Sequence, residues 1–430
     1  MIPGTVALLL LLLALGLPVA AVLAILGMTL GDLIAGLPLS RAMGETAWSA
    51  NSEVIIVAVP LFVLMGEILL RSGVAERMYD SAVQWMSWLP GGLMHSNIGA
   101  CTIFAATSGS SAATAATIGT VSIPEMRKRG YNQSLFLGTI AAGGTLGILI
   151  PPSINLIVYG VLTETSIPKL YLAGFIPGFL LAGLFMVTVL IACLVRPRWG
   201  GEPVATSWDA RLASLPALLP PLGLFLVVIG SIYAGIATPT ESASLGVIAS
   251  LALAAANRRL TWPVLRTAIE GTMRTTAMIL LIFVAAFYLN FVISAVGLTH
   301  EINQLILNLG LSPLQTLLAV VAFYLVLGCF METMAMMITT VPIIAPVVTS
   351  MGYDPIWFGV IVILLVETAM ITPPVGVNLY IVHGIRREGA LQDIMVGAAP
   401  FVLALLAMVG ILIAFPDLAL WLPELWEQYR

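Results

Sequence analysis

Two apolar stretches of this chain each contain a pair of adjacent prolines. One reads Ile150-Pro151-Pro152-Ser153 and the other reads Thr372-Pro373-Pro374-Val375. Proline has no backbone N–H, and its ring clashes with the preceding turn, so a helix cannot run through such a pair. Lipid offers no hydrogen bonds to the backbone groups that are released. A membrane helix that holds either pair must therefore open inside the bilayer, where its freed carbonyls face protein, water or an ion.

The composition is that of a multi-pass membrane protein. Of its 430 residues, 60% are hydrophobic and only 9% are charged, whereas a soluble domain carries roughly 25% charged residues. A span needs about 20 residues, so the chain has room for about ten to twelve crossings. We therefore expect the lipid bilayer as its surroundings. No basic patch indicates nucleic acid as a partner.

The chain shows no pattern typical of an enzyme. It has no nucleophile–base pair, and its cysteines and histidines lack zinc or haem spacing. The cysteines lie in apolar runs and the histidines are scattered: Cys101, Cys193, Cys329, His95, His300 and His383. We predict that the protein is not an enzyme and holds no organic cofactor.

Hydrophobicity divides the chain into five segments. Within the first of them, residues 4–36 form either one long tilted helix or two short ones. We interpret the five segments as an N-terminal scaffold (1–52), a first repeat (53–167), scaffold helices (168–274), a second repeat (275–389) and a C-terminal helix with a tail (390–430).

The two repeats share an order of parts. The first contains an interfacial helix, a hairpin at 93–126 and a broken helix at 131–163, and the second contains a hairpin at 312–350 and a broken helix at 355–384. Pro124 and Pro346 are 222 residues apart, as are Pro151 and Pro373, and the offset from Asn155 to Asn378 is 223. A fixed spacing of helix breakers in the same order indicates an internal repeat.

Charge predicts that the repeats are inverted. Basic clusters at 127–129, 196–211, 258–274 and 386–387 should all lie on the cytoplasmic side. All four clusters can lie on one side only if the segment 312–350 enters and leaves the membrane on the same face, as a re-entrant hairpin. The internal repeat implies the same path for the segment 93–126. Two inverted halves, each with a broken helix, are the pattern of a secondary transporter. The predicted fold is therefore all-α, with two re-entrant hairpins.

The first hairpin has a polar tip, Ser108-Gly109-Ser110-Ser111. If this tip lies at mid-membrane opposite residues 143–155, it gathers the hydroxyl and carbonyl oxygens that a hard cation prefers. Helix N-termini beside it would attract a carboxylate. The alternative is close helix packing, for which small residues also serve.

Acidic side chains lie near the second proline pair. Glu332 belongs to the second hairpin tip, where it would balance a bound Na⁺, exchange a proton or form a structural hydrogen bond. Glu367 is a second acid in an apolar run. Glu67, by contrast, is interpreted as a helix-contact residue. Thr238-Pro239-Thr240-Glu241 has the pattern of a capping box that opens a helix.

Several motifs, in order along the chain, resemble the large membrane subunit of the tripartite ATP-independent periplasmic (TRAP) transporters. They are Ser108-Gly109-Ser110, Pro124-Glu125-Met126, Ile150-Pro151-Pro152-Ser153, Ala173-Gly174-Phe175-Ile176-Pro177-Gly178, Thr238-Pro239-Thr240-Glu241 and Thr372-Pro373-Pro374-Val375-Gly376. The resemblance implies a Na⁺-driven importer of small organic anions, carboxylates or sulfonates, in the bacterial inner membrane. It also implies an elevator mechanism, a small four-helix membrane subunit and a periplasmic substrate-binding protein.

The resemblance implies two Na⁺ sites, each between a hairpin tip and its broken helix. The residues are Ser108, Gly109, Ser110, Gly147 and Pro151 for one ion, and Glu332, Thr333, Thr372 and Pro373 for the other. Family members often have Asp where this chain has Thr114 and Glu332. We expect the anion to contact nearby hydroxyls and amides, namely those of Ser110, Ser111, Thr114, Ser153, Asn155 and Asn378.

Two other functions stay open at this stage. One is a stand-alone organic-anion transporter coupled to protons or another cation, with Glu332 as the proton carrier. The other is a channel whose re-entrant hairpins form pore loops.

Overall fold

The described residues of the computed structural model, namely 2–34, 36, 38–298, 301 and 310–428, contain helices and no strand. Residues 4–36 follow the second alternative. Helix α1 (Ile2–Ala14) ends before Gly16, which has a φ of +69°, and α2 (Val19–Met28) begins after Pro18. A π-helical turn (Thr29–Ile34) and α3 (Met43–Ser52) follow.

The first repeat contains six helices. They are α4 (Ala58–Arg71), α5 (Val74–Met86), α6 (Leu93–Ser108), α7 (Ser111–Lys128), α8 (Gln133–Leu149) and α9 (Ile154–Thr163). Its broken helix is interrupted at Pro151-Pro152, as predicted, and α8 and α9 are bent by 43°.

Four helices between the repeats lead into one long helix. They are α10 (Ile167–Val195), α11 (Trp208–Ser214), α12 (Leu219–Tyr233) and α13 (Pro239–Ala256), followed by α14 (Trp262–Ala295). The capping box at the start of α13 is confirmed, since Thr238 and Glu241 bond each other's backbone N–H. Most of the basic cluster at 258–274 belongs to the first part of α14, because Pro263 near its start favours a helix and no proline or glycine pair interrupts it.

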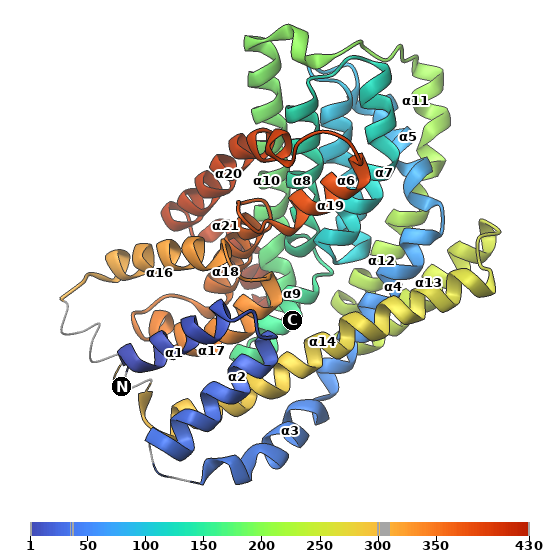
Figure 1. Ribbon diagram of the computed structural model, residues 1–430. Coiled ribbons are helices and arrows are strands. Elements are labelled where there is room, and N and C mark those ends of the chain that lie inside the picture. The colour runs from blue at the N-terminus through green and yellow to red at the C-terminus, as the bar shows by residue number, and fades with distance from the viewer. Residues whose placement is uncertain (1, 35, 37, 299–300, 302–309, 429–430) are drawn as a thin grey trace.

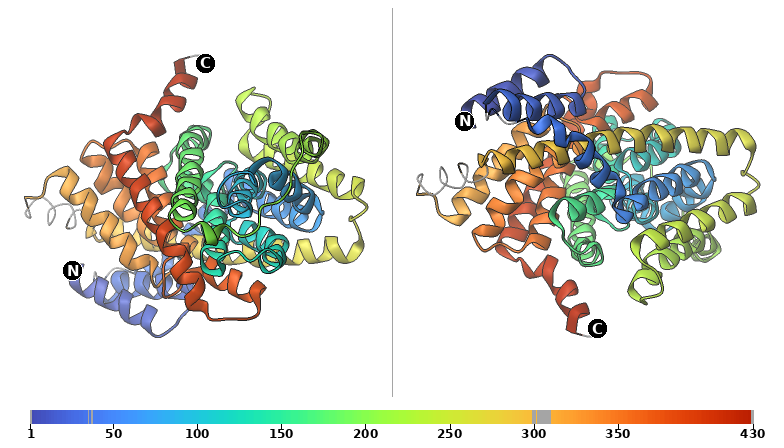
Figure 2. Two further views of the ribbon diagram at one scale, coloured as in Figure 1. Left: turned by 90° about the horizontal axis from the view of Figure 1, so that it is seen from above. Right: turned by 90° about the horizontal axis from the view of Figure 1, so that it is seen from below.

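The second repeat and the C-terminal segment complete the chain. They comprise α16 (Pro313–Gly328), α17 (Thr333–Ser350), α18 (Pro355–Met370), α19 (Val377–Arg386), α20 (Leu391–Ala414) and α21 (Asp417–Gln428). Helix α14 (yellow) extends across the molecule, from the second-repeat helices (orange) at one end to the first repeat at the other (Figure 2).

Among the described residues, seven helical segments are long and apolar enough to cross a membrane, and α8 with α9 would make an eighth. This is fewer than the chain length allows, because α16, α18 and α19 are shorter than a span. Helix α17, one arm of the predicted hairpin at 312–350, is among the seven by length and composition. The re-entrant path of both hairpins therefore stays a prediction.

The repeat is visible in the helix boundaries. Helices α7 and α17 are both 18 residues long. The first residue of α17 follows the first residue of α7 by 222 positions, and the same offset relates their last residues. Helices α9 and α19 are both 10 residues long at an offset of 223. Even the caps correspond, since Ser110 accepts from Ala113 N and Glu332 accepts from Ala335 N.

The first broken helix and α18 of the second lie at the centre of the protein. All residues from 135 to 160 and from 357 to 371 are buried. Helix α8 lies between α6 and α7 on one side and α10 and α20 on the other (Figure 1). It meets α20 through two glycines, because a Cβ at Gly138 would collide with Gly397 O and a Cβ at Gly397 with Ser134 O.

We predict that Gly397→Ala separates α8 from α20 and lowers the free energy of unfolding by about 1–3 kcal/mol, the usual cost of overpacking. The thermal unfolding midpoint of the detergent-solubilised protein measures this. Gly410→Ala is the matched control on the same helix, since a Cβ there meets no atom within 4 Å. Equal midpoints for the two variants would contradict the proposed contact.

Candidate functional site

A central cavity of about 430 Å³ lies where the two hairpin tips and the two broken helices meet. Seven of the residues singled out in the sequence line it. They are Ser108, Gly109, Ser110, Ser111, Asn155, Glu332 and Thr333. Side chains of α4 and α14 complete the wall, among them Glu67 and Thr275.

Four helices begin at this cavity. The lining includes the first residues of α7 (Ser111), α9 (Ile154), α17 (Thr333) and α19 (Val377). Each helix N-terminus carries unpaired N–H groups and about half a positive charge, and both favour an anion. The backbone therefore supplies most of the positive potential, because no Lys or Arg is among the lining residues of the described chain.

The first tip forms a cluster of buried oxygens. Ser108 Oγ lies 3.0 Å from Thr114 Oγ1, and Thr114 Oγ1 donates to Ser110 O at 2.8 Å. Gly147 of α8 faces this cluster, since a Cβ there would lie 2.7 Å from Ser110 O and 2.8 Å from Thr114 Oγ1. Only a residue without a side chain allows the tip to approach α8 this closely.

The first tip also meets the break itself. A Cβ at Gly109, which has a φ of +61°, would lie 2.8 Å from Pro152 O. Ser153 caps α9 by accepting from Leu156 N, and its hydroxyl donates to Ile148 O. Pro151 is buried beside Gly174 of α10. The structure thus brings Ser108, Gly109, Ser110 and Gly147 together at the break, while Pro151 packs outward.

Asn378 connects the two halves of the protein. Its Nδ2 donates to Ser111 Oγ at 2.8 Å and to Ala141 O at 2.9 Å. It lies behind the first tip and is not among the cavity-lining residues. Asn378 was predicted to contact the anion, but both of its amide donors hold the first tip against α8.

The second tip is arranged differently. Glu332 caps α17 through Ala335 N at 3.1 Å and accepts from Thr333 Oγ1 at 2.8 Å. Thr372 donates instead to Thr368 O at 2.6 Å, and Pro373 is exposed. Neither Thr372 nor Pro373 lines the cavity. The structure therefore does not assemble the second predicted ligand set.

Asn155 belongs to the cavity wall, as do residues of both tips. Its side chain is buried, and within the described chain its Nδ2 has no hydrogen-bond partner. An unpaired buried amide donor is costly, so a native structure needs an explanation for it.

Glu67 is a cavity residue that the sequence interpretation underestimated. It forms an ion pair with Arg71 and touches α14, because a Cβ at Gly271 would lie 2.8 Å from its Oε2. It is thus a helix contact, as predicted, and also part of the cavity wall. An acid inside an apolar span was the signal for this role. Glu367 is fully buried outside the cavity, and neither carboxylate oxygen has a partner among the described residues.

The cavity suits a hard cation bound by oxygens of the protein. Among the described residues, no group of three or more His, Cys, Asp or Glu side chains gathers anywhere. Hydroxyls, backbone carbonyls and single carboxylates are the available ligands, and these fit Na⁺ better than a transition metal.

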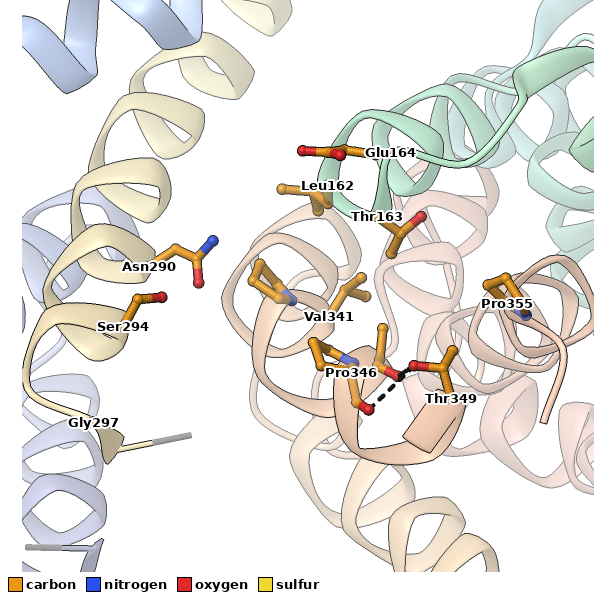
Figure 3. A pocket seen from close by; sticks show the side chains of 12 residues that line it. Leu162, Thr163, Glu164, Asn290, Ser294, Gly297, Val341, Pro346, Thr349 and Pro355 are labelled. Carbon is orange, nitrogen blue, oxygen red and sulfur yellow. Dashed lines mark hydrogen bonds between the residues drawn. The ribbon is translucent and has the colours of Figure 1, made fainter. Parts of the chain in front are cut away.

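Two larger cavities lie away from the predicted residues. One, of about 710 Å³, separates α14 from α17 and the end of α9, and Figure 3 shows Asn290 and Ser294 facing Val341 and Pro346 across it. The other, of about 700 Å³, is its counterpart in the repeat. Offsets of 222 and 223 relate Pro124 to Pro346, Arg127 to Thr349, Arg386 to Thr163 and Arg387 to Glu164.

Comparisons with known proteins show the family of this chain. A family model described as "Tripartite ATP-independent periplasmic transporter, DctM component" matches residues 6–418. The C4-dicarboxylate TRAP transporter large permease protein DctM of Vibrio cholerae is 32% identical over 93% of this chain and 96% of its own length. An ectoine/5-hydroxyectoine TRAP transporter large permease protein of Ruegeria pomeroyi is 34% identical over 86% of each chain.

A solved structure shares the fold. The Alcanivorax borkumensis YdaH transporter aligns with a TM-score of 0.66 over 96% of this chain and 99% of its own, at 17% identity. At this identity the likeness concerns the fold alone.

We predict that Asn378→Leu loosens the first tip, because it removes two hydrogen bonds each worth about 0.5–1.5 kcal/mol. Hydrogen exchange of the amides at 107–114 should become faster. Thr340→Val is the control, since it removes a comparable bond to Tyr324 in the second hairpin and should leave 107–114 unchanged. Unchanged hydrogen exchange at 107–114 in Asn378→Leu would show that the two hydrogen bonds of Asn378 do not stabilise the first tip.

Proposed function

The chain belongs to the tripartite ATP-independent periplasmic transporter family as its DctM component, and from this premise we propose that it imports small organic anions by Na⁺-coupled secondary transport. It is a multi-pass membrane subunit of a transporter and not an enzyme. The proposed location is the bacterial inner membrane. The proposed partners are a small four-helix membrane subunit and a periplasmic substrate-binding protein that delivers the anion.

One observation carries the proposal: four helix N-termini open on one cavity that has a cluster of buried oxygens at its edge. The N-termini favour a carboxylate or sulfonate. The oxygens of Ser108, Ser110 and Thr114 favour Na⁺. Cation and anion bound side by side stabilise each other, and that mutual stabilisation is the coupling free energy that a symporter requires.

The substrate class follows from the cavity and the relatives together. No Lys or Arg lines the cavity in the described chain, so hydroxyls and the helix N-termini would contact the anion. Relatives are named for C4-dicarboxylate and for ectoine. We propose a small carboxylate as the first candidate, with a sulfonate as the alternative of similar charge and size.

The proposed movement is of the elevator type. The two repeats, which hold the tips and the broken helices, would move as a unit against the helices outside the repeat. Helices α10 to α13 and the small subunit would form the fixed part. The break in each central helix supports this proposal, since transporters commonly bind their substrate at broken helices near the interface of their repeats.

We predict that proteoliposomes containing the chain, its small subunit and its binding protein take up a C4-dicarboxylate when an inward Na⁺ gradient is imposed. Uptake should fall to the background level when choline replaces Na⁺, because the cation completes the anion site. The same vesicles with an imposed pH gradient and no Na⁺ test the rival proton coupling through Glu332. Uptake driven by the pH gradient alone would reject Na⁺ coupling, and single-channel currents would indicate a pore.

We predict that Thr114→Val raises the Na⁺ concentration for half-maximal uptake roughly three- to tenfold, because it removes one oxygen of the first-tip cluster. Thr114→Ser is the matched control, since it keeps the hydroxyl and should behave like the native protein. Equal Na⁺ dependence for Thr114→Val and the native chain would exclude this hydroxyl from the cation site.

A further inference from the structure

We propose that Asn155 is a positioning residue that closes the second hairpin tip by donating a hydrogen bond from Nδ2 to the Thr333 hydroxyl. This inference rests on the proposed Na⁺-coupled transport, because closure of the tip is taken to follow filling of the cavity. It gives Asn155 a role different from direct contact with the anion.

The first half of the protein provides the template. Asn378, in the broken helix of the second repeat, donates to Ser111 Oγ at the first residue of α7 and to Ala141 O on α8. One amide thereby ties a hairpin tip to the opposite broken helix. The first tip is closed in this structure, with Ser110 O directly against Gly147.

The repeat assigns the counterpart of each partner. Adding 222 to Ser111 gives Thr333, which is the first residue of α17. Subtracting 223 from Asn378 gives Asn155, which occupies the same second position of α9 that Asn378 occupies in α19. The matching caps, Ser110 to Ala113 N and Glu332 to Ala335 N, fix this register in the structure itself.

The hydrogen bond from Asn155 to Thr333 is not formed in this structure, although both residues line the cavity. Asn155 is 1% exposed, and its Nδ2 lacks a partner in the described chain. Thr333 Oγ1 donates to Glu332 Oε1, which leaves the lone pairs of the hydroxyl free to accept. The Asn155–Thr333 bond therefore needs a movement of the tip and no loss of an existing bond.

The bond explains why an amide donor is kept unpaired at the cavity. Closing the second tip would satisfy Nδ2 and bring Glu332 towards its broken helix, where the second cation set was expected. Cavity filling and tip closure then favour each other. The second tip is the movable one in this arrangement, while Asn378 holds the first tip in place.

Thiol cross-linking in the reconstituted transporter tests whether Asn155 and Thr333 come together. The chain would carry Asn155→Cys with Thr333→Cys, and the control chain Ser111→Cys with Asn378→Cys, both with the three native cysteines replaced by alanine. A short bifunctional thiol reagent is applied in choline chloride, in NaCl, and in NaCl with succinate. The control pair should cross-link in all three, and the Asn155–Thr333 pair should cross-link several-fold more with Na⁺, most of all with succinate.

Equal cross-linking of the Asn155–Thr333 pair in all three solutions, or in none, would overturn the proposal. Na⁺-independent uptake together with Na⁺-dependent cross-linking would reject Na⁺-coupled transport but support the Asn155–Thr333 contact. Na⁺-driven uptake without this cross-link would reject only the Asn155–Thr333 contact.

A double-mutant cycle without cysteines gives a second readout. Asn155→Leu and Thr333→Val should each raise the half-saturating Na⁺ concentration roughly three- to tenfold, and the double variant no more than the larger single effect. Thr333→Ser keeps the acceptor and should restore native Na⁺ dependence, which a purely structural role of the methyl group would not predict. Additive effects of the two substitutions would contradict a bond between them.

Discussion

Backbone oxygens and N–H groups released at the two proline pairs must find partners inside the protein, and the architecture follows from this constraint. The first broken helix is enclosed at its break, since every residue from 135 to 160 is buried. The second is buried from 357 to 371, whereas Pro373 and Pro374 at its break are exposed. The remaining helices surround the buried segments. Where the helices part, they leave a cavity bordered by four helix N-termini, and this is where the proposed binding site lies.

The two halves use one plan with different side chains where each hairpin meets its broken helix. Gly144 and Gly147 let the first hairpin approach α8, because a Cβ at Gly147 would lie 2.7 Å from Ser110 O of the tip and one at Gly144 would lie 2.7 Å from Ala115 Cβ of α7. Their counterparts at an offset of 222 are Val366 and Ala369. In the second half the glycine lies on the hairpin instead, since a Cβ at Gly328, the last residue of α16, would lie 2.5 Å from Ala369 Cβ. The two halves thus reach close contact with glycines on opposite partners.

The sequence predicted the elements better than their contacts. Proline pairs, caps and the 222-residue spacing located both breaks and both tips, because these features act over a few residues of the chain. The arginines at 258–274 marked a basic stretch but gave no sign that most of it is helical, since arginine does not prevent a helix. Asn378 was placed beside the anion, although its donors hold the first tip. The partner of an amide depends on residues more than 200 positions away, which no local pattern reports.

The sequence by itself determined that the chain is a multi-pass membrane protein, that its two halves repeat and that each half contains a helix broken by prolines. These conclusions follow from the solvation of backbone and side chains, which depends on residue type and local spacing. Only the tertiary structure decided that four helix N-termini share one cavity, that Glu67 joins its wall and that Asn378 holds the first tip against α8. Those facts depend on how distant helices pack, and packing is set by the whole surface of each helix and not by any one motif.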